Sequence, residues 1–470
     1  MIDRIKNQEV LVVGIARSGM AAVELLQRAG AAKIMVTDSK KTGDLQEELE
    51  CLRRYPSVEV VTGGNPPGLI KNSTSLVVKS PGVPPSLVLF DEARKHGVPV
   101  ISEIELAYTF LKAPLIGVTG TNGKTTTTAL IAAIMKEARF EPVAAAGNIG
   151  SPLSGMVDKI NARGYIIAEL SSFQLEDIAH FRPNIGLFLN FAADHLDYHG
   201  TIEKYWQAKV RIFENQKSSD YAVLNAADEK ITALQHQCPG KVIWFGPQPV
   251  SVGVGLEDGW VTAYNPGTQP QKICPRDQIS LPGAHNLENA LAAAAAAWAA
   301  GADPGAIDRT LRSFRAIEHR LEHVAALGGV DYINDSKGTN PGATIKALTS
   351  FPGRKKILIA GGKDKGADFT ELAAVIHREA RFLVLLGETR VKLADAVKAI
   401  GFNSYLEVET LKEAVEAAAG KAEKGDVVLL SPACASWDMF SDYEARGKLF
   451  KELVRNLLQK FREKGDTADG

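Results

Sequence analysis

Residues 117–126 read Gly-Val-Thr-Gly-Thr-Asn-Gly-Lys-Thr-Thr, and this stretch decides the fold of the middle of the chain. The apolar run Leu115–Val118 predicts a buried strand, and Thr125–Ala138 has the pattern of a helix. Consecutive backbone N–H groups that open a helix form a cradle for phosphate. In such a cradle Lys124 reaches the outer phosphates and the Thr125 hydroxyl ligates Mg²⁺. The stretch therefore predicts an ATP-binding loop.

The loop departs at one position from the strict pattern Gly-x-x-x-x-Gly-Lys-Ser/Thr. Val118 stands where that pattern has its first glycine, and Gly117 and Gly120 flank it instead. The strand, the lysine and the helix still agree with a phosphate loop. Nucleotide binding is thus predicted, whereas the loop alone does not specify a reaction.

Strands alternate with helices on both sides of this loop, which predicts an α/β protein with mostly parallel, doubly wound sheets. We predict three domains: a Rossmann-like domain at residues 1–102, a P-loop ATPase-like domain at 103–316 and a Rossmann-like domain at 317–470. The stretch Cys238–Pro282 lacks a helix signal and is expected to form a small antiparallel excursion.

Composition excludes several classes of protein. Lys plus Arg is 54 and Asp plus Glu is 55, so the chain lacks the basic excess of a nucleic-acid-binding protein. The spacing of the four cysteines fits neither a zinc site nor a disulfide framework. We see no signal peptide, and the alanine-rich stretch Ala290–Ala300 is interpreted as a buried helix. We therefore expect a cytoplasmic protein without membrane insertion.

The first segment contains an incomplete dinucleotide fingerprint. Gly14-Ile-Ala-Arg-Ser-Gly19 follows a predicted strand, and Asp38 ends the next strand. Ala16 replaces the middle glycine of the fingerprint, which disfavours a nicotinamide cofactor. Two other interpretations stay open: a nucleotide diphosphate held by Arg17, Ser18 and Asp38, or a tight turn without a ligand.

Polar residues also follow two predicted strands of the middle segment. Glu169 ends the strand Tyr165–Ala168, and His195 lies shortly after the strand Ile185–Leu189. Open α/β sheets bind ligands at the carboxyl ends of their strands, where Glu169 would suit Mg²⁺. His195 is either a second functional group or a structural hydrogen-bonding residue.

Several ordered motifs resemble those of the Mur ligases, and together they span nearly the whole chain. They are Gly120-Thr-Asn-Gly-Lys-Thr-Thr126, Glu169-Leu-Ser-Ser-Phe-Gln174, Asp194-His195, His285-Asn286 with Asn289, His319-Arg320, Asn334-Asp-Ser-Lys-Gly-Thr-Asn340 and Ser431-Pro-Ala-Cys-Ala-Ser436. Within that family the chain most resembles the branch that adds D-glutamate. The motifs Ser80-Pro-Gly-Val-Pro84 and Gly361-Gly-Lys-Asp-Lys-Gly-Ala-Asp-Phe369 carry this closer resemblance.

The resemblance implies an ATP-dependent ligase of peptidoglycan synthesis, acting in cell-wall biogenesis and thereby in cell shape and division. Its substrates would be UDP-N-acetylmuramoyl-L-alanine and D-glutamate. ATP would phosphorylate the substrate carboxylate, and the amine of D-glutamate would attack the acyl phosphate. The resemblance also implies two Mg²⁺ ions and a carbamylated Lys209. We expect a monomeric enzyme. Side-chain chemistry by itself gives no reason to prefer Lys209 over Lys204.

The resemblance assigns site residues position by position. The catalytic set is Lys124, Glu169, His195 and Lys209, and the metal set is Thr125, Thr126, Glu169, His195 and Lys209. ATP would be bound by Gly120, Thr121, Asn122, Gly123, Lys124, Thr125, Thr126, Asn289, Arg320 and Asp335. The UDP substrate would be bound by Arg17, Ser18, Asp38, Ser80, Gly82, Asn148 and Ser171, and D-glutamate by Lys337, Thr339, Lys365, Ser436 and Tyr443.

Three other functions stay open at this point. The first is another amide ligase of the family, such as folylpolyglutamate synthase or the alanine-adding enzyme. The second is an NAD(P) oxidoreductase that uses the first segment. The third is a nucleotide-dependent switch without ligase activity.

Overall fold

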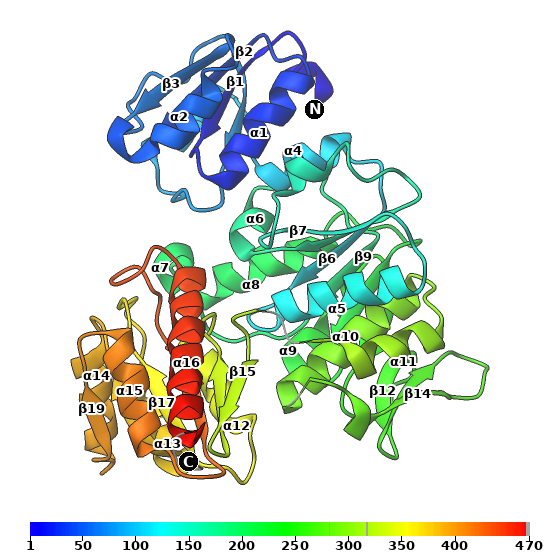
Figure 1. Ribbon diagram of the computed structural model, residues 1–470. Coiled ribbons are helices and arrows are strands. Elements are labelled where there is room, and N and C mark those ends of the chain that lie inside the picture. The colour runs from blue at the N-terminus through cyan, green and yellow to red at the C-terminus, as the bar shows by residue number, and fades with distance from the viewer. Residues whose placement is uncertain (282, 316–317, 467–470) are drawn as a thin grey trace. The chain divides into compact units, whose positions relative to one another are not determined.

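The computed structural model describes residues 1–281, 283–315 and 318–466, which contain three β-sheets with helices packed against them (Figure 1). The chain divides into two compact units. The first unit comprises Met1–Ile279 and Leu287–Phe314, and the second comprises Ser280–Asn286 and Arg315–Gly470. The domain boundary predicted between residues 316 and 317 lies outside the described residues.

The first sheet is fully parallel, with the order β3-β2-β1-β4-β5. Its strands are β1 (Glu9–Val13), β2 (Lys33–Asp38), β3 (Val58–Thr62), β4 (Thr74–Lys79) and β5 (Val100–Ser102). Its helices are α1 (Arg17–Arg28), α2 (Gln46–Leu52) and α3 (Val88–Lys95), and α4 (Glu103–Phe110) follows β5.

The side chains of β1 alternate between two cores, as expected for a strand that is covered on both faces. Val10 and Val12 pack in the same core as α1, whereas Leu11 and Val13 pack with Leu89 and Phe90 of α3. This arrangement confirms the doubly wound sheet predicted for the first segment.

The second sheet has the order β14-β13-β12-β11-β10-β9-β6-β8-β7. Its strands are β6 (Leu115–Thr119), β7 (Val143–Gly147), β8 (Tyr165–Glu169), β9 (Ile185–Phe188), β10 (Tyr221–Asn225), β11 (Lys241–Phe245), β12 (Gly253–Glu257), β13 (Trp260–Tyr264) and β14 (Gln271–Pro275). Its helices are α5 (Lys124–Glu137), α6 (Ser172–Glu176), α7 (Leu196–His199), α8 (Ile202–Val210), α9 (Glu229–Thr232), α10 (Ala284–Ala299) and α11 (Pro304–Ser313). Figure 1 shows α5, α10 and α11 gathered beside this sheet.

The predicted antiparallel excursion is only partly right. The strands β12, β13 and β14 pair antiparallel, but β11 pairs parallel with both β10 and β12. The excursion is therefore an extension of the parallel sheet. The alanine run Ala290–Ala297 is fully buried within α10, as predicted, and no helix among the described residues is long and apolar enough to cross a membrane.

The third sheet, in the second unit, has the order β15-β16-β20-β17-β18-β19 and is parallel except for the β15–β16 pair. Its strands are β15 (Glu322–Leu327), β16 (Val330–Asn334), β17 (Lys356–Ala360), β18 (Ala380–Leu385), β19 (Tyr405–Glu407) and β20 (Val427–Leu430). Its helices are α12 (Pro341–Thr349), α13 (Thr370–Glu379), α14 (Arg390–Ala399), α15 (Leu411–Lys421) and α16 (Tyr443–Asp466).

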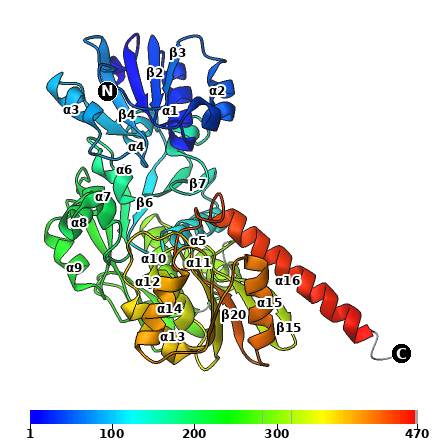
Figure 2. The same cartoon turned by 90° about the vertical axis from the view of Figure 1, so that its left-hand side faces the viewer.

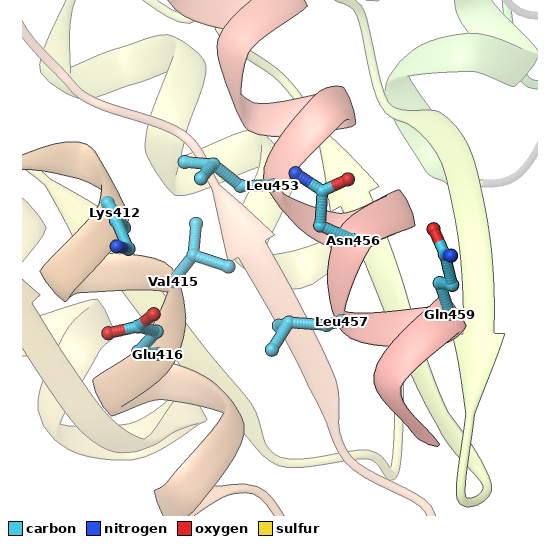
Figure 3. A pocket seen from close by; sticks show the side chains of 7 residues that line it. All are labelled: Lys412, Val415, Glu416, Leu453, Asn456, Leu457 and Gln459. Carbon is cyan, nitrogen blue, oxygen red and sulfur yellow. The ribbon is translucent and has the colours of Figure 1, made fainter. Parts of the chain in front are cut away.

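The helices of the second unit cover both faces of its sheet. One core contains α12, α13 and α14, and the other contains α15 and α16 (Figure 2). A groove between α15 and α16 has the apolar side chains Val415, Leu453 and Leu457 and is rimmed by polar ones (Figure 3). None of the predicted site residues lines that groove.

Candidate active site

The phosphate loop joins β6 to α5, as the sequence predicts. Gly123 precedes α5 with φ +85°, and a Cβ atom there would lie 2.2 Å from Oδ1 of Asn289. Glycine is required at this position because any other side chain would be strained and would collide with Asn289. Nζ of Lys124 donates to the carbonyl oxygens of Gly120 and Thr121, at 2.9 Å each. The lysine therefore lies over the loop that carries the cradle of N–H groups.

Asn190, two residues beyond β9, holds this loop from the side. Its Oδ1 accepts from the backbone N–H of Asn122 at 2.9 Å, and its Nδ2 donates to the Asn122 carbonyl at 3.1 Å. Its own carbonyl accepts from the N–H of Thr121 at 3.0 Å. Sequence reasoning missed Asn190, although its place directly after a predicted strand was an available signal.

Glu169, Asn148 and Ser171 lie together at the neighbouring strand ends. Glu169 ends β8 in register with Val118 of β6, and its side chain is buried. Nδ2 of Asn148 donates to Oε1 of Glu169 at 2.8 Å. Ser171 is the N-cap of α6, where its hydroxyl accepts from the N–H of Gln174. Residues predicted for the metal (Glu169) and for the UDP substrate (Asn148 and Ser171) thus lie at neighbouring strand ends beside the phosphate loop.

Lys209 is buried in α8 with only 1% of its surface exposed. Its Nζ donates to the carbonyl of Gly120 at 2.8 Å and lies 4.7 Å from the ring centroid of Tyr205. Burial, reinforced by the positive charge of Lys124, holds the pKa of Lys209 well below its ordinary value. Lys204 of the same helix is exposed. Of the two lysines, only Lys209 is therefore seen to contact the phosphate loop.

Tyr205, one turn before Lys209, was also missed by sequence reasoning. Its hydroxyl lies 3.3 Å from Oγ1 of Thr121 in the phosphate loop. The spacing of four residues places Tyr205 and Lys209 on the same face of α8. That spacing would have suggested Tyr205 only after Lys209 had been selected.

His195 directly precedes α7 and packs against α6. Its ring meets the ring of Phe173 edge-on, with centroids 4.9 Å apart, and its Nε2 lies 3.7 Å from Oδ2 of Asp194. The Phe173 ring stacks on His199, whose Nε2 lies 2.9 Å from the hydroxyl of Ser172. The segment that carries His195 therefore packs against α6.

Five of the seven predicted UDP-binding residues lie around the turn between β1 and α1. A Cβ atom at Gly19 would lie 1.8 Å from the carbonyl oxygen of Gly14, so the turn requires this glycine. Oδ2 of Asp38 accepts from the N–H of Ile15 at 2.9 Å, and Oγ of Ser80 donates to the Gly14 carbonyl at 2.9 Å. Three further predicted residues lie at the solvent side of this cluster: Arg17 and Gly82 are exposed and Ser18 is half-buried.

Asp335 lies at the carboxyl end of β16, in the second unit. It is 95% buried, and its Oδ2 accepts from the hydroxyl of Ser431 at 2.7 Å. Burial raises the pKa of Asp335 to about 6, against the opposing effects of the Ser431 hydrogen bond and the charge of Arg320. The next helix, α12, is capped by the side chain of Asn340 and not by Asp335.

The predicted D-glutamate residues are only partly brought together. Nζ of Lys337 lies over the ring of Tyr443, 5.1 Å from its centroid. Thr339 follows in the same loop, where its N–H donates to the Lys337 carbonyl. Ser436 is buried in the loop after β20, whereas Lys365 is an exposed residue of the loop after β17.

Arg446 of α16 joins two of these loops and was not selected from the sequence. Its guanidinium donates to the hydroxyl and the carbonyl of Ser336, at 3.0 and 2.8 Å, and to the carbonyls of Cys434 and Ala435. Burial lowers the pKa of Arg446 to about 10. An arginine on a terminal helix gave no sign of this role in the sequence.

Comparison with known proteins agrees with this geometry. Three family models match: the MurD-like Mur ligase N-terminal domain at residues 8–102, the Mur ligase middle domain at 118–297 and the Mur ligase glutamate ligase domain at 319–434. The UDP-N-acetylmuramoylalanine–D-glutamate ligase of Pelotomaculum thermopropionicum is 46% identical over 97% of this chain and 99% of its own length. The enzyme of the same name from Koribacter versatilis is 43% identical over 97% of this chain and 99% of its own.

Solved structures share the fold at low identity. The UDP-N-acetylmuramate–alanine ligase MurC of Thermotoga maritima superimposes with a TM-score of 0.59 at 22% identity, over 95% of this chain and 99% of that one. The MurF ligase of Thermotoga maritima in complex with ADP gives a TM-score of 0.58 at 17% identity, over 98% of this chain and 97% of that one. With its phosphate loop, its three sheets and these near-full-length relatives, the chain belongs to the Mur ligase family.

Proposed function

We propose that this chain is the ATP-dependent ligase that joins D-glutamate to UDP-N-acetylmuramoyl-L-alanine in peptidoglycan precursor synthesis. The observation that carries the proposal is the 46% identity, over nearly the full length of both chains, to a ligase named for this reaction. Lys124, Glu169 and Lys209 lie around the phosphate loop, where Glu169 and Lys209 are buried and Lys124 is partly buried, and they supply the chemistry such a reaction needs. An NAD(P) oxidoreductase, a nucleotide switch and another ligase of the family are not favoured by these relatives.

The first chemical step is phosphoryl transfer from ATP to the carboxylate of the UDP substrate. A carboxylate oxygen attacks the γ-phosphorus, the bond to the β–γ bridging oxygen breaks, and ADP leaves. This step needs alignment and charge neutralisation more than covalent help from the protein. The N–H groups of the loop and the ammonium of Lys124 supply positive charge where the phosphates lie. Asn190 fixes the loop, so that these donors do not have to reorganise during the reaction.

The residues beside the loop fit magnesium. Mg²⁺ prefers oxygen ligands and usually keeps several waters and substrate phosphates in its shell. Thr125 and Thr126 open α5, and the carboxylate of Glu169 stands one strand away. We assign Thr125, Thr126 and Glu169 to a first Mg²⁺, and His195 with Lys209 to a second. When bound, the ions neutralise the charge that develops on the transferring phosphoryl group.

Lys209 fits the carbamate that the family resemblance implies. Its amine is enclosed between the loop and Tyr205, and burial favours the neutral form that reacts with CO₂. A carbamate would change this buried cation into an anion able to ligate Mg²⁺. We expect mass spectrometry of the native enzyme to show a mass increase equal to one CO₂ on the peptide containing Lys209. A Lys209→Met variant that retains full activity would contradict this role.

The second step is attack by the amine of D-glutamate on the acyl phosphate. The C–N bond forms, the amine loses a proton, and the tetrahedral intermediate collapses to the amide with release of phosphate. D-Glutamate brings two carboxylates, which cations and hydroxyl donors recognise best. We assign them to Lys337, Thr339, Lys365, Ser436 and Tyr443. We assign adenine and ribose to Asn289, Arg320 and Asp335.

The decisive experiment measures phosphate release with ATP, Mg²⁺ and UDP-N-acetylmuramoyl-L-alanine while the amino acid is varied. We expect release with D-glutamate and only background release with L-glutamate, L-alanine or no amino acid. Release that depends on L-glutamate or L-alanine instead would refute the proposal. Mass spectrometry of the product then identifies the new amide.

We also propose that the enzyme acts as a monomer in the cytoplasm, without nucleic-acid or membrane partners. The balanced charge of 54 basic and 55 acidic residues supports the absence of a nucleic-acid partner. Light scattering coupled to size exclusion tests the monomer, since a dimer would double the measured mass.

A further inference from the structure

Lys79 is a buried cation that the proposed chemistry does not use. It is the last residue of β4, and only 2% of its side chain is exposed. Its Nζ lies 2.5 Å from Oδ2 of Asp177, 3.6 Å from Oε2 of Glu176 and 3.2 Å from the hydroxyl of Tyr198. It also lies over the ring of Phe90, 5.6 Å from the centroid. A buried ammonium is thus held by two carboxylates, a phenol and an aromatic face.

These partners belong to segments that carry proposed site residues. Lys79 directly precedes Ser80, whose hydroxyl bonds the turn after β1. Glu176 is the last residue of α6, the short helix that Ser171 caps, and Asp177 is the residue that follows it. The Lys79 amine therefore joins the end of β4 to the helix that begins beside Glu169.

Tyr198 extends this connection to the proposed metal ligand. It lies in α7, three residues after His195, and its hydroxyl donates to Oε2 of Glu176 at 3.0 Å. Its ring and the His195 ring both pack on Phe173, with centroids 4.3 and 4.9 Å from the Phe173 centroid. A shift of the Tyr198 hydroxyl would therefore move the short segment that holds His195.

We propose that Lys79 is a positioning residue, which couples the loop of Ser80 to the segments that carry Ser171 and His195. The inference rests on the proposed function, which gives His195 to a magnesium ion, and on the family resemblance, which implies that Ser80 and Ser171 bind the UDP substrate. The ammonium acts through its three oxygen partners and touches no reacting group. Its effect is to hold two parts of one substrate site in register.

The contacts of Lys79 also explain what a charged side chain does at this position. Removing one partner of a buried ion pair leaves the other charges without compensation, and Glu176 and Asp177 would then move toward solvent. An apolar side chain of similar length fills the space but holds none of the three oxygens. A variant without the Lys79 ammonium should therefore bind the UDP substrate and Mg²⁺ more weakly, whereas its affinity for D-glutamate should not change.

The test is steady-state kinetics of the full enzyme with the variant Lys79→Met. We expect the KM for UDP-N-acetylmuramoyl-L-alanine and the half-saturating Mg²⁺ concentration to rise about tenfold, the scale seen when residues that orient metal ligands are removed. The KM for D-glutamate should change less than about twofold. Tyr198→Phe keeps the ring on Phe173 and should produce the same pattern more weakly.

Lys356→Met is the matched control. Lys356 is a fully buried lysine of the second unit, paired with Glu379 at 3.0 Å, and it lies at the start of β17, at the opposite end of that strand from the loop that carries Lys365. The variant Lys356→Met should lower the stability of the second unit without raising the constants for the UDP substrate and Mg²⁺ selectively. Unchanged constants in both Lys79→Met and Tyr198→Phe, or equal rises in the constants for the UDP substrate, Mg²⁺ and D-glutamate, would overturn the inference. An unsubstituted enzyme that releases no phosphate with D-glutamate would instead overturn the proposed function.

Discussion

Asp335 offers a test in which stability and activity should change in opposite directions. The carboxyl is 95% buried at the end of β16, and burial raises its pKa from 3.8 to about 6. The folded protein therefore disfavours the charged form that the carboxyl has at neutral pH. We predict that Asp335→Asn stabilises the second unit at pH 8 and lowers ligase activity, because the proposed role of Asp335 is in nucleotide binding.

The magnitude follows from linkage between protonation and folding. Because the folded pKa is raised, the folded state holds more protons than the unfolded state between about pH 4 and pH 6. Stability therefore falls as pH rises through that window, and the penalty is complete above it. A difference of 2.2 between 6 and 3.8 corresponds to about 3 kcal/mol, at ~1.4 kcal/mol per pKa unit. Asparagine avoids this penalty but alters the hydrogen bond to Ser431, so we expect a net gain of about 1–3 kcal/mol at pH 8.

The measurement is urea unfolding at pH 4.5 and pH 8, followed by hydrogen exchange at the amides of β16 and β20. This observable reports on the third sheet and not on the chain as a whole. The gain from Asp335→Asn should be present at pH 8 and small at pH 4.5. A stability difference independent of pH, or a loss of stability at pH 8, would refute the reasoning.

Asp331 of the same strand is the matched control, because its pKa is shifted in the opposite direction. Hydrogen bonds and charges from Arg354 and His323 lower the pKa of Asp331, although burial opposes them. Its contribution to stability is present above its ordinary pKa and is lost as pH falls through the lower folded value. Asp331→Asn should therefore destabilise the sheet at pH 8.

Three further changes test individual contacts. Gly123→Ala forces φ +85° on a residue with a side chain and pushes Asn289 aside. The KM for ATP should therefore rise at least about tenfold in the phosphate assay, whereas the KM for D-glutamate should stay the same. Arg446→Met leaves the Ser336 carbonyl without its donor, so the free energy of urea unfolding of the second unit should fall by about 3 kcal/mol and the KM for D-glutamate should rise. Arg446→Lys should restore part of the stability and part of the D-glutamate affinity. Glu105→Gln removes an acceptor shared by the N–H groups of residues 179–181, so the free energy of unfolding should fall by about 1–3 kcal/mol with unchanged KM values.

The sequence predicted several strands whose apolar runs are buried on both faces, but it missed β10, which is equally buried. The predicted strand Leu115–Val118 is one residue shorter than β6, and Tyr165–Ala168 is one residue shorter than β8. β3 and β5 were missed because Val58–Thr62 is only half-buried and Val100–Ser102 has three residues. Neither segment has the long apolar run that marks a central strand. Edge strands owe their structure to the neighbour with which they pair.

Some residues of the candidate site could likewise be predicted from the sequence, and others could not. Residues in a contiguous motif, such as Lys124 and Thr125, could be assigned from chemistry and spacing. Lys209 could be assigned only through the family resemblance, because its bare sequence context resembles that of the exposed Lys204. Asn190 and Arg446 act through contacts between segments far apart in the sequence. No local pattern identifies such contacts before the fold is known.

The buried charges explain why these residues are worth testing together. Lys79, Lys209 and Asp335 are each at least 95% buried, and an apolar or neutral residue would be easier to bury at each position. Lys356 is equally buried, but Glu379 pairs with it and no proposed site residue lies in that contact. Burial of charge alone therefore does not mark function. What distinguishes the first three is that their polar partners belong to segments that also carry proposed site residues. If that distinction is right, neutral variants of those three should lose substrate or metal binding, and Lys356→Met should lose only stability.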